Sequence, residues 1–596
     1  MNIDSRNIPV GISDFDALIS RNGKYIDKTS YLESLLDSST AVHLLLKPRR
    51  FGKTLSMSML AAFLEMNYQN PEDRSRQEKL FKGLNVYENN KPLCDRYMGR
   101  YPVISISLKD ADGKTEIDAM NSLLNILFEL FRKFNFLMNS QKIDSMVKSG
   151  FEERFEFCKR VNRELTKPEN KETAKNVINT ALAFLMSTLV EEYGRPVAVI
   201  VDEYDVPLQK AAVNGYYPEM LELIRSIMSS TLKDNTNLFK GYVTGCLRIT
   251  HQSIFTGVNN FSIFGQCDED FAGFIGLTLE ETRQLFSECG LENRLQDAVD
   301  WYDGYNFADN DMLCPWSVLS FLRNALRNSN PATFEPRNYW ANSSGNDILE
   351  ICMKHATANT SQRLQNLLDG GTEVIAEREF TAYPDIAKNH DFDVFATMMM
   401  HTGYLTVDRN AESSGQNVSV RIPNREVLEC FRLKANTVFG RSNPEWLAKS
   451  QKLLEALFAG EAESVATIIR SMLISFLSSR NTAYEGVYHA FLLGILAIAT
   501  DEADADIKSN SERGDGYSDL VLCNDDKDVA AIIEFKKSDS ESRSAWKELS
   551  GQALEQIDLQ NYDFDLRKDY SIVHKYGIAF HGKHCMVAHK ECRNQN

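Results

Sequence analysis

The segment Leu44-Leu-Leu-Lys-Pro-Arg-Arg-Phe-Gly-Lys-Thr-Leu-Ser56 decides the fold of the N-terminal half, because it predicts a buried strand that turns directly into a helix. Backbone N–H groups at the start of such a helix bind phosphate. In a Gly-Lys-Thr loop the lysine reaches the β- and γ-phosphates of a nucleotide, and the threonine holds Mg²⁺. The predicted ATP-binding residues of this loop are Arg49, Arg50, Gly52, Lys53, Thr54 and Leu55, with Thr54 also a magnesium ligand.

One position of the loop departs from the full phosphate-binding pattern. The pattern has a glycine five residues before Gly52, and this chain has Lys47 there. A lysine disfavours the left-handed backbone that glycine permits. The loop alone therefore leaves an ordinary strand–turn–helix, without a nucleotide, as an alternative.

A second apolar strand supplies acids that would complete a nucleotide site. Val197-Ala-Val-Ile-Val-Asp-Glu-Tyr-Asp205 places Asp202 and Glu203 at the carboxyl end of a strand, where open α/β sheets bind their ligands. We expect Asp202 to coordinate Mg²⁺ through water and Glu203 to polarise the attacking water. The alternative is a buried strand that ends in solvated acids.

Two more polar residues follow the strand predicted at 238–243. Thr244 is expected to sense the γ-phosphate, and Arg248 to supply positive charge to the transition state. A position on a surface loop is the alternative for Arg248.

Short apolar strands alternate with amphipathic helices up to about residue 275. Buried strands that alternate with helices indicate a parallel sheet covered on both faces. The predicted strands are 41–46, 101–107, 196–201 and 238–243, and the predicted helices include 120–137 and 175–193.

The middle of the chain has a different pattern. Residues 278–328 are mostly helical, interrupted by Trp301-Tyr-Asp-Gly-Tyr-Asn-Phe307. A helix beginning near Asp393 and strands at 404–407 and 418–422 outline a winged helix. We expect it to pack as a lid, with DNA binding as the alternative. Helices are predicted at 444–458 and 461–477.

Carboxylates and a lysine recur near the C-terminus at a spacing that suits metal chemistry. Strands at 518–522 and 529–536 are joined by a short turn, so Asp519 is expected to lie beside Glu534. Because strand side chains alternate, Glu534 and Lys536 share one face. The two acids and the Phe535 carbonyl are predicted to hold Mg²⁺. Such an ion activates water, while Lys536 orients the nucleophile or stabilises developing charge.

Two flanking features fit this hairpin. Glu485, at the start of a preceding helix, is expected to add a carboxylate, and the helix at 553–557 carries Gln556, followed by Tyr562. A salt-bridged sheet edge without catalysis is the alternative. The His and Cys residues of 581–592 resemble a zinc knuckle, but strands at 576–580 and 585–588 joined by His581-Gly-Lys583 favour a simple hairpin.

Composition limits the classes of protein that fit. A chain of 596 residues is too long for one core. The net charge of -17 argues against non-specific coating of nucleic acid, although a local basic groove remains compatible with it. The eleven cysteines include no C-x-x-C pair, residues 1–10 show no secretory signal, and the longest apolar run, 491–499, is too short for a membrane span. We expect a cytoplasmic protein that does not enter a membrane.

These motifs together resemble those of bacterial AAA-ATPase-like proteins fused to a nuclease domain of the PD-(D/E)XK superfamily. The resemblance covers nearly the whole chain and rests on 8–15, 25–29, 48–55, 202–205, 301–305, 315–318 and 339–340, together with Glu485, Asp519, 534–536 and Gln556. It implies ATP binding and hydrolysis, a Mg²⁺-dependent nuclease, and a setting in defence or mobile-element biology. The missing first glycine is usual in the family, and Ser518 stands where proline gives the superfamily its name.

The resemblance implies an α/β fold in five parts. These are an AAA-ATPase-like P-loop domain (1–277), a helical lid (278–345), a winged-helix-like region (346–445), connecting helices (446–478) and a nuclease-like domain (479–596). Our first hypothesis is an ATP-regulated, Mg²⁺-dependent DNA endonuclease, possible as a homo-oligomer because ATPases of this type borrow an arginine across subunits. The second is a nucleotide-dependent switch whose nuclease fold binds nucleic acid or protein without cutting.

Overall fold

Two compact units make up the computed structural model. Unit 1 comprises Met1–Pro336 and His355–Asn424, and unit 2 comprises Arg337–Lys354 and Arg425–Asn596, so each unit contains two separate pieces of chain. The residues that the structure describes are 4–160, 168–247, 261–308, 310–328, 330–340, 358–368, 370–376, 391–408, 417–431, 444–476, 488, 491–493, 495–496, 499–500, 503, 505–513 and 516–593.

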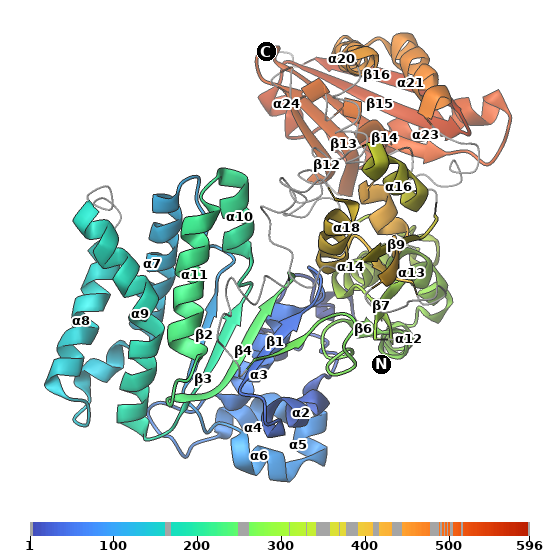
Figure 1. The fold of residues 1–596 in the computed structure, drawn as a ribbon. Coiled ribbons are helices and arrows are strands. Elements are labelled where there is room, and N and C mark those ends of the chain that lie inside the picture. Colours follow the sequence, from blue (N-terminus) through green and yellow to red (C-terminus); the bar gives the residue numbers. More distant parts are fainter. Residues whose placement is uncertain are drawn as a thin grey trace. The chain divides into compact units, whose positions relative to one another are not determined.

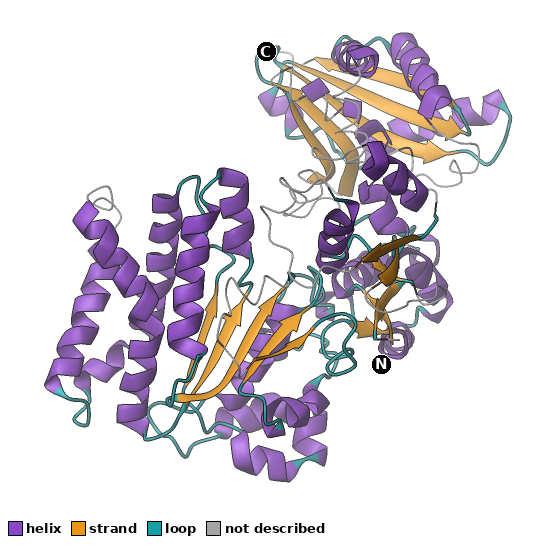
Figure 2. Ribbon diagram, in the orientation of Figure 1, coloured by secondary structure: helices purple, strands orange, loops and turns teal. Residues whose placement is uncertain are grey.

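A five-stranded parallel sheet forms the centre of the N-terminal part of unit 1 (Figures 1 and 2). Its strands, in spatial order, are β2 (Val103–Ser107), β3 (Val197–Asp202), β4 (Leu238–Gly245), β1 (Val42–Leu46) and β5 (Phe261–Phe264). β1 and β3 are buried along their whole length, as expected for strands covered on both faces. The predicted parallel α/β sheet is confirmed, and β5 is a strand that the sequence did not predict.

Helices cover both faces of this sheet. From β1 the chain crosses the sheet to β2 at its edge, and from β2 it returns through β3 to β4. Because such crossovers are right-handed, α3 lies on one face of the sheet, and α7, α9 and α11 lie on the other. The helices are α1 (Phe15–Ser20), α2 (Leu32–Asp37), α3 (Lys53–Leu64), α4 (Ser75–Phe81), α5 (Asn85–Asn89), α6 (Lys91–Tyr97), α7 (Glu116–Lys133), α8 (Ser145–Arg160), α9 (Pro168–Tyr193), α10 (Val206–Asn214) and α11 (Tyr217–Leu232).

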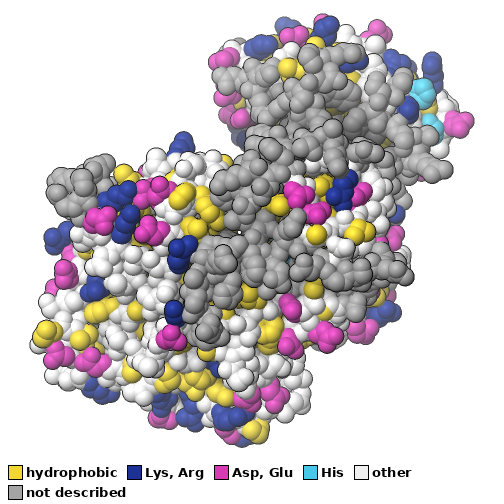
Figure 3. Space-filling model, in the orientation of Figure 1, with side chains coloured by type: hydrophobic (Ala, Val, Ile, Leu, Met, Phe, Trp, Pro, Cys, Tyr) yellow, Lys and Arg dark blue, Asp and Glu magenta, His cyan; other side chains and the backbone are white. Residues whose placement is uncertain are grey.

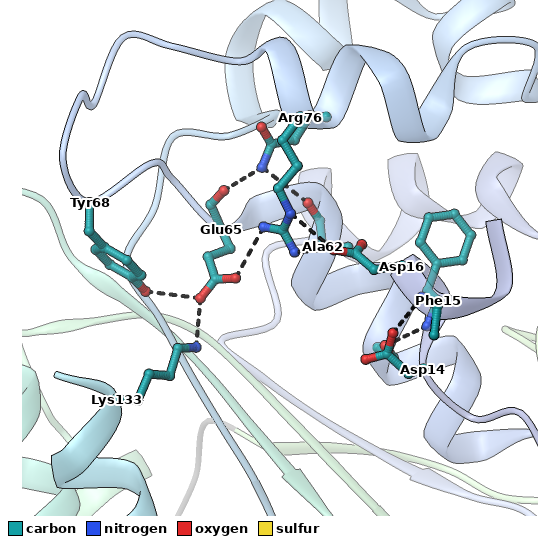
Figure 4. Close-up of polar contacts among 11 residues, drawn as sticks. Asp14, Phe15, Asp16, Ala62, Glu65, Tyr68, Arg76 and Lys133 are labelled. Atoms are coloured by element: carbon teal, nitrogen blue, oxygen red, sulfur yellow. Dashed lines mark hydrogen bonds and ion pairs between the residues drawn. The ribbon is translucent and has the colours of Figure 1, made fainter. Parts of the chain in front are cut away.

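A polar cluster at the end of α3 ties helices from both faces together (Figure 4). The Glu65 carboxylate accepts hydrogen bonds from Lys133 Nζ of α7 at 2.6 Å and from the Tyr68 hydroxyl at 3.2 Å. Arg76 of α4 donates to Glu65 at 3.3 Å and to Asp16 of α1 at 2.6 Å. Each exposed ion pair stabilises little by itself, but together they fix the C-terminal end of the helix whose N-terminal end follows the phosphate loop.

The rest of unit 1 contains two small antiparallel sheets and several helices, which fits the predicted helical middle region (Figure 2). The elements up to residue 327 are β6 (Leu277–Thr278), α12 (Leu279–Glu288), α13 (Leu295–Tyr302), β7 (Tyr305–Phe307), β8 (Asn310–Leu313) and α14 (Pro315–Arg327), which we call the lid. The later ones are α16 (Ala358–Leu368), β9 (Glu373–Ala376), α18 (Phe392–Thr402), β10 (Thr406–Val407) and β11 (Asn417–Arg421). The winged-helix assignment of this last group stays a prediction.

The lid is docked on the phosphate loop through an aromatic contact. Phe51 is 1% exposed, and its ring lies edge-on to Tyr305, with centroids 4.8 Å apart, and 5.2 Å from Phe307. Gly276, at φ +117°, lets the backbone pass close by, since an added Cβ would lie 3.0 Å from Phe51 Cδ1. One side chain of the loop is therefore part of the lid's core.

Unit 2 contains a second five-stranded sheet, in which only the β14–β15 pair is parallel. Its strands are β12 (Asp506–Arg513), β13 (Gly516–Asn524), β14 (Val529–Lys537), β15 (Ile572–His581) and β16 (His584–Arg593). Its helices are α20 (Pro444–Phe458), α21 (Ala462–Phe476), α23 (Arg543–Leu559) and α24 (Leu566–Asp569). The C-terminal mixed α/β fold and the hairpin at 581–584 are thus confirmed.

Alternation along β13 and β14 divides the core of unit 2 between the two faces of the sheet. Leu520, Leu522, Ile533 and Phe535 pack in the core that includes α20 and α21. Val521, Ala530 and Ile532 pack in the core that includes Ile557 of α23. By this period of two, Asp519, Glu534 and Lys536 belong to the face that carries α23.

The N-terminal piece of unit 2 is held by one buried carboxylate. Glu426, 1% exposed, accepts hydrogen bonds from the backbone N–H groups of Tyr339 at 2.7 Å and Trp340 at 3.1 Å. Asn338 also donates to the Glu426 carbonyl at 2.9 Å. This clasp joins two pieces of chain that are distant in sequence.

Among the described residues, no helix combines the length and the apolar character needed to cross a membrane.

Replacing Phe51 by alanine tests the docking of the lid. Removing a buried phenylalanine ring typically destabilises a core by about 3–5 kcal/mol, so Phe51→Ala should lower the first thermal unfolding midpoint of the full chain clearly. The matched control is Phe136→Ala, which removes a ring that is 40% exposed. Equal shifts in the two variants would show that the contact with the lid carries no stability.

Candidate active sites

The phosphate loop joins β1 to α3 through two residues with left-handed backbone. These are Arg50, at φ 68°, and Gly52, at φ 93°. Lys47, the residue that replaces the first glycine of the pattern, does not have a positive φ. The loop therefore does not need a glycine at that position.

Lys47 instead serves as a structural contact with the remainder of unit 1. Its ammonium group donates to the Gly265 carbonyl at 2.9 Å and lies 4.5 Å from the centre of the Phe307 ring. Burial lowers the pKa of Lys47 to about 8, partly opposed by Asp268 and Cys267. The side chain points toward the lid and is engaged there by Gly265 and Phe307.

Lys53 is 3% exposed and lies among acceptors of the loop and the acidic strand. Its Nζ donates to the carbonyls of Lys47 and Pro48, both at 3.1 Å, and lies 3.6 Å from Glu203 Oε1. Burial alone would lower the pKa of Lys53, but the neighbouring Cys246 and acids such as Glu203 raise it. These neighbours favour the charged form of Lys53 at the start of α3, which suits an anionic ligand.

Asp202 connects predicted site residues from three elements, the strands β3 and β4 and the helix α3. Its carboxylate accepts a hydrogen bond from Thr54 Oγ1 at 2.7 Å and another from Thr244 Oγ1. Burial and the charge of Glu203 raise the pKa of Asp202, against the effect of its two hydroxyl donors. A buried carboxylate next to a threonine hydroxyl is a donor set that fits Mg²⁺.

Glu203 has the strained backbone that active-site residues often show. Its φ is 57°, which a non-glycine residue adopts only where surrounding contacts hold it. The Glu203 N–H donates to Thr244 Oγ1 at 3.4 Å, and the Tyr204 N–H donates to the Thr244 carbonyl at 3.1 Å. Thr244 thus positions both Asp202 and Glu203, a role beyond the phosphate sensing predicted from sequence.

A cavity of about 320 Å³ lies beside these residues and is lined by Arg50, Gly52, Lys53, Thr54, Leu55 and Glu203 together with the N-terminal segment and the lid. Arg49 lies apart from this lining, hydrogen-bonded to Gln209 on α10. Arg248 lies outside the described residues.

The C-terminal site brings the predicted acids together as the sequence suggested. Asp519 Oδ2 accepts the Phe535 N–H at 2.8 Å, and the Asp519 N–H donates to Glu534 Oε2 at 3.4 Å. Gln556 of α23 donates to Glu534 Oε1 at 2.5 Å, and Lys536 Nζ lies 4.0 Å from the same oxygen. Asp519, Glu534, Lys536 and Gln556 are therefore one cluster.

The electrostatics of this cluster are compatible with binding of a cation. Glu534 is 3% exposed, and burial together with the charge of Asp519 raises its pKa well above the usual range. Lys536 and Arg337, the first residue of unit 2, act in the opposite direction. A buried carboxylate beside a second, partly exposed acid is an arrangement that a hard divalent ion would stabilise.

The described residues include only part of the predicted ligand set. Among the described residues no group of three His, Cys, Asp or Glu side chains comes together. Glu485 lies outside the described residues, so a third ligand from it, like one from the Phe535 carbonyl, stays a prediction. Tyr562, 3% exposed, lies close enough for the charges of Glu534 and Asp519 to raise its pKa, although burial is the main cause.

Comparison with known proteins identifies the class of each part. Residues 9–255 match the family model described as a predicted AAA-ATPase, AAA-ATPase-like. Residues 483–590 match the PD-(D/E)XK nuclease superfamily. The chain thus combines an AAA-ATPase-like region with a C-terminal PD-(D/E)XK nuclease-superfamily region, in the predicted order.

One relative is similar over nearly its whole length. It is described as an uncharacterized protein in the vnfD 5' region of Azotobacter chroococcum mcd 1, and it is 22% identical over 591 residues, which are 96% of each chain.

Several contributors to the sites were not singled out by sequence reasoning. Phe51 and Lys47 were treated as loop residues, and nothing in their spacing shows that they contact the lid. Arg337 lies nearly 200 positions before Glu534. The pattern Tyr339-Trp340, which belongs to the family resemblance, was the only signal near it.

The raised pKa of Glu534 predicts a pH-dependent gain in stability for Glu534→Gln. A carboxyl group with a raised pKa stabilises the folded state while protonated, and this contribution is lost as pH rises from its ordinary value of 4.5 through the folded value. In chelator, Glu534→Gln should therefore unfold at a higher temperature than wild type near neutral pH, with the difference shrinking below about pH 4.

Thermal unfolding across this pH range provides the measurement. Glu555→Gln, which removes an exposed carboxylate from the same helix as Gln556, is the control and should show no such trend. If the unfolding temperatures of Glu534→Gln and wild type differed by the same amount at all pH values, the raised pKa of Glu534 would be contradicted.

Proposed function

We propose that this chain is an ATP-regulated, Mg²⁺-dependent DNA endonuclease, with ATP at the loop of unit 1 and cleavage at the carboxylate cluster of unit 2. The observation that carries the proposal is the contact of Asp519 with Glu534, with Lys536 and Gln556 on the same face of the sheet. The match to the PD-(D/E)XK superfamily supports the reaction class.

In unit 1 each residue has a role that its contacts support. Lys53 and the N–H groups at the start of α3 bind the β- and γ-phosphates, and Thr54 with Asp202 holds the magnesium ion that neutralises them. Glu203 orients the attacking water, and Thr244 keeps Glu203 and Asp202 in register. Arg50, which lines the cavity, adds positive charge near the phosphates.

In unit 2 the carboxylates hold a metal ion and Lys536 acts on the nucleophile. Asp519, Glu534 and the Phe535 carbonyl are the proposed ligands, with Glu485 as a further carboxylate. Mg²⁺ held by these ligands would supply a more acidic water and positive charge for the scissile phosphate. Gln556 orients Glu534 by donating to Oε1, which leaves Oε2 on the side of Asp519.

The charge of the protein shapes how it would reach DNA. On the described surface visible in Figure 3, Asp and Glu side chains are interspersed with Lys and Arg side chains. The Lys and Arg side chains visible there form no continuous basic band. With a net charge of -17, non-specific attraction to phosphate is weak. Control of DNA binding by the nucleotide is one way for a protein with this charge to cut DNA only when the nucleotide allows it.

Nucleotide binding is tested by Lys53→Ala. Loss of the buried ammonium should reduce ATP affinity at least about tenfold, the scale of a charge-assisted phosphate contact. Isothermal titration with a slowly hydrolysed ATP analogue and Mg²⁺ measures this. Lys91→Ala, which removes a lysine that is 81% exposed, is the matched control. An unchanged affinity in Lys53→Ala would remove the ATP site from this loop.

Cleavage is tested by plasmid relaxation with Mg²⁺ and ATP. Glu534→Ala and Lys536→Ala should each lower the rate by at least about a hundredfold, since each removes a metal ligand or a charge at the reacting phosphate. Lys537→Ala is the control, because this neighbouring lysine pairs with Asp539 instead. Equal residual cutting in wild type and all variants would favour a nucleotide-dependent switch that binds without cleaving.

A further inference from the structure

The cavity beside the phosphate loop has an apolar end that phosphate binding does not require. Its apolar lining comes from the N-terminal segment, the first part of α3 and the start of α14. The residues of this end are Pro9, Val10, Ile12, Leu55, Pro315, Trp316 and Leu319. Because Lys53 and Thr54 line the same cavity of about 320 Å³, a molecule bound to them has these apolar residues within the same cavity.

Trp316 provides the flat surface of this end. It lies in the first turn of α14, directly after Pro315. Gly11, at φ +83°, passes beside it, since an added Cβ would lie 3.9 Å from Trp316 Cζ3. A side chain at position 11 would therefore contact the indole ring, and glycine keeps this side of the ring free of one.

Arg50 currently covers this ring. Its guanidinium carbon lies 5.2 Å from the centre of the Trp316 ring, a cation–π contact. The backbone at Arg50 has φ 68°, and its carbonyl lies 3.7 Å from Cys314 Sγ, which donates to it. Arg50 therefore joins the phosphate loop to the residue before α14, with its charge held on an aromatic face.

We propose that the nucleobase of ATP stacks on Trp316 in place of the Arg50 guanidinium, and that the displaced Arg50 turns to the phosphates. This inference rests on the proposed ATP site, because the base can reach Trp316 only if the phosphates bind at Lys53 and Thr54. The exchange replaces one π-contact by another at the ring. It also moves a cation from an aromatic face to an anion, where charge-assisted hydrogen bonds are stronger.

The exchange has a consequence for which nucleotides bind. The apolar end offers stacking area, and stacking favours the larger ring system of a purine over a pyrimidine. ATP and GTP should therefore bind more tightly than CTP and UTP. Since Arg50 and Trp316 lie on the loop and the lid respectively, nucleotide binding would also replace a direct contact between these two elements.

Three ligands separate the contributions of base and phosphate. ATP, adenosine and inorganic tripolyphosphate are titrated against the full chain, with tryptophan fluorescence and calorimetry as readouts. Trp316→Leu should weaken ATP about tenfold, the scale of losing one stacked base, while tripolyphosphate affinity changes less than about twofold. Trp316→Phe, which keeps a ring, should recover most of the ATP affinity.

Arg50→Gln gives the sharper result because it should move two affinities in opposite directions. Adenosine should bind more tightly once the cover of the ring is gone, and tripolyphosphate should bind more weakly once the cation is gone. A merely structural role of Arg50 would weaken both. Trp301→Phe, a lid tryptophan outside the cavity lining, should leave the quenching by ATP unchanged.

The outcomes distinguish this inference from the function on which it rests. Unchanged ATP affinity in Trp316→Leu, or equal losses for ATP and tripolyphosphate, would overturn the base site while the phosphate site stands. Failure of wild type to bind tripolyphosphate and ATP would overturn both.

Discussion

The contact of Phe51 with the lid is the constraint on which the N-terminal unit depends. A phosphate loop must keep its backbone N–H groups pointing at a ligand, which normally requires glycines that also make the loop soft. Here Lys47 stands in place of the first glycine. The loop is held by contacts with β7, because Phe51 packs against Tyr305 and Lys47 lies over the ring of Phe307. The same contacts make the geometry of the loop and the position of the lid interdependent.

The carboxylate cluster of unit 2 is shaped by a different kind of constraint. Alternation along β13 and β14 sends apolar side chains into two cores, one on each face, and leaves the acids at the ends of those same rows. The acids cannot separate without moving strands that are packed on both sides. The cores therefore keep Asp519 next to the buried Glu534, and burial together with the charge of Asp519 raises the pKa of Glu534.

The sequence predicted the elements whose pattern is periodic or whose chemistry is local. β1, β3, the hairpin of β13 and β14, and the pairing of Asp519 with Glu534 all follow from apolar runs and alternation. β5 was not predicted, because Phe261–Phe264 is short and its four residues are only partly buried. The roles of Lys47, Thr244 and Arg337 arise from long-range contacts, which no spacing rule reveals. Glu485 and Arg248 lie outside the described residues.

The hydrogen bonds that Glu426 accepts limit how genetic recombination can rearrange such a protein. The C-terminal unit begins with residues that lie far upstream, next to the end of the lid region, and the Glu426 carboxylate binds their backbone. A recombination point placed anywhere between the two pieces would leave Tyr339 and Trp340 on one gene and their acceptor on another. Unit 2 is thus built from two separate pieces of chain, and inheritance of its C-terminal piece alone would remove part of its own structure.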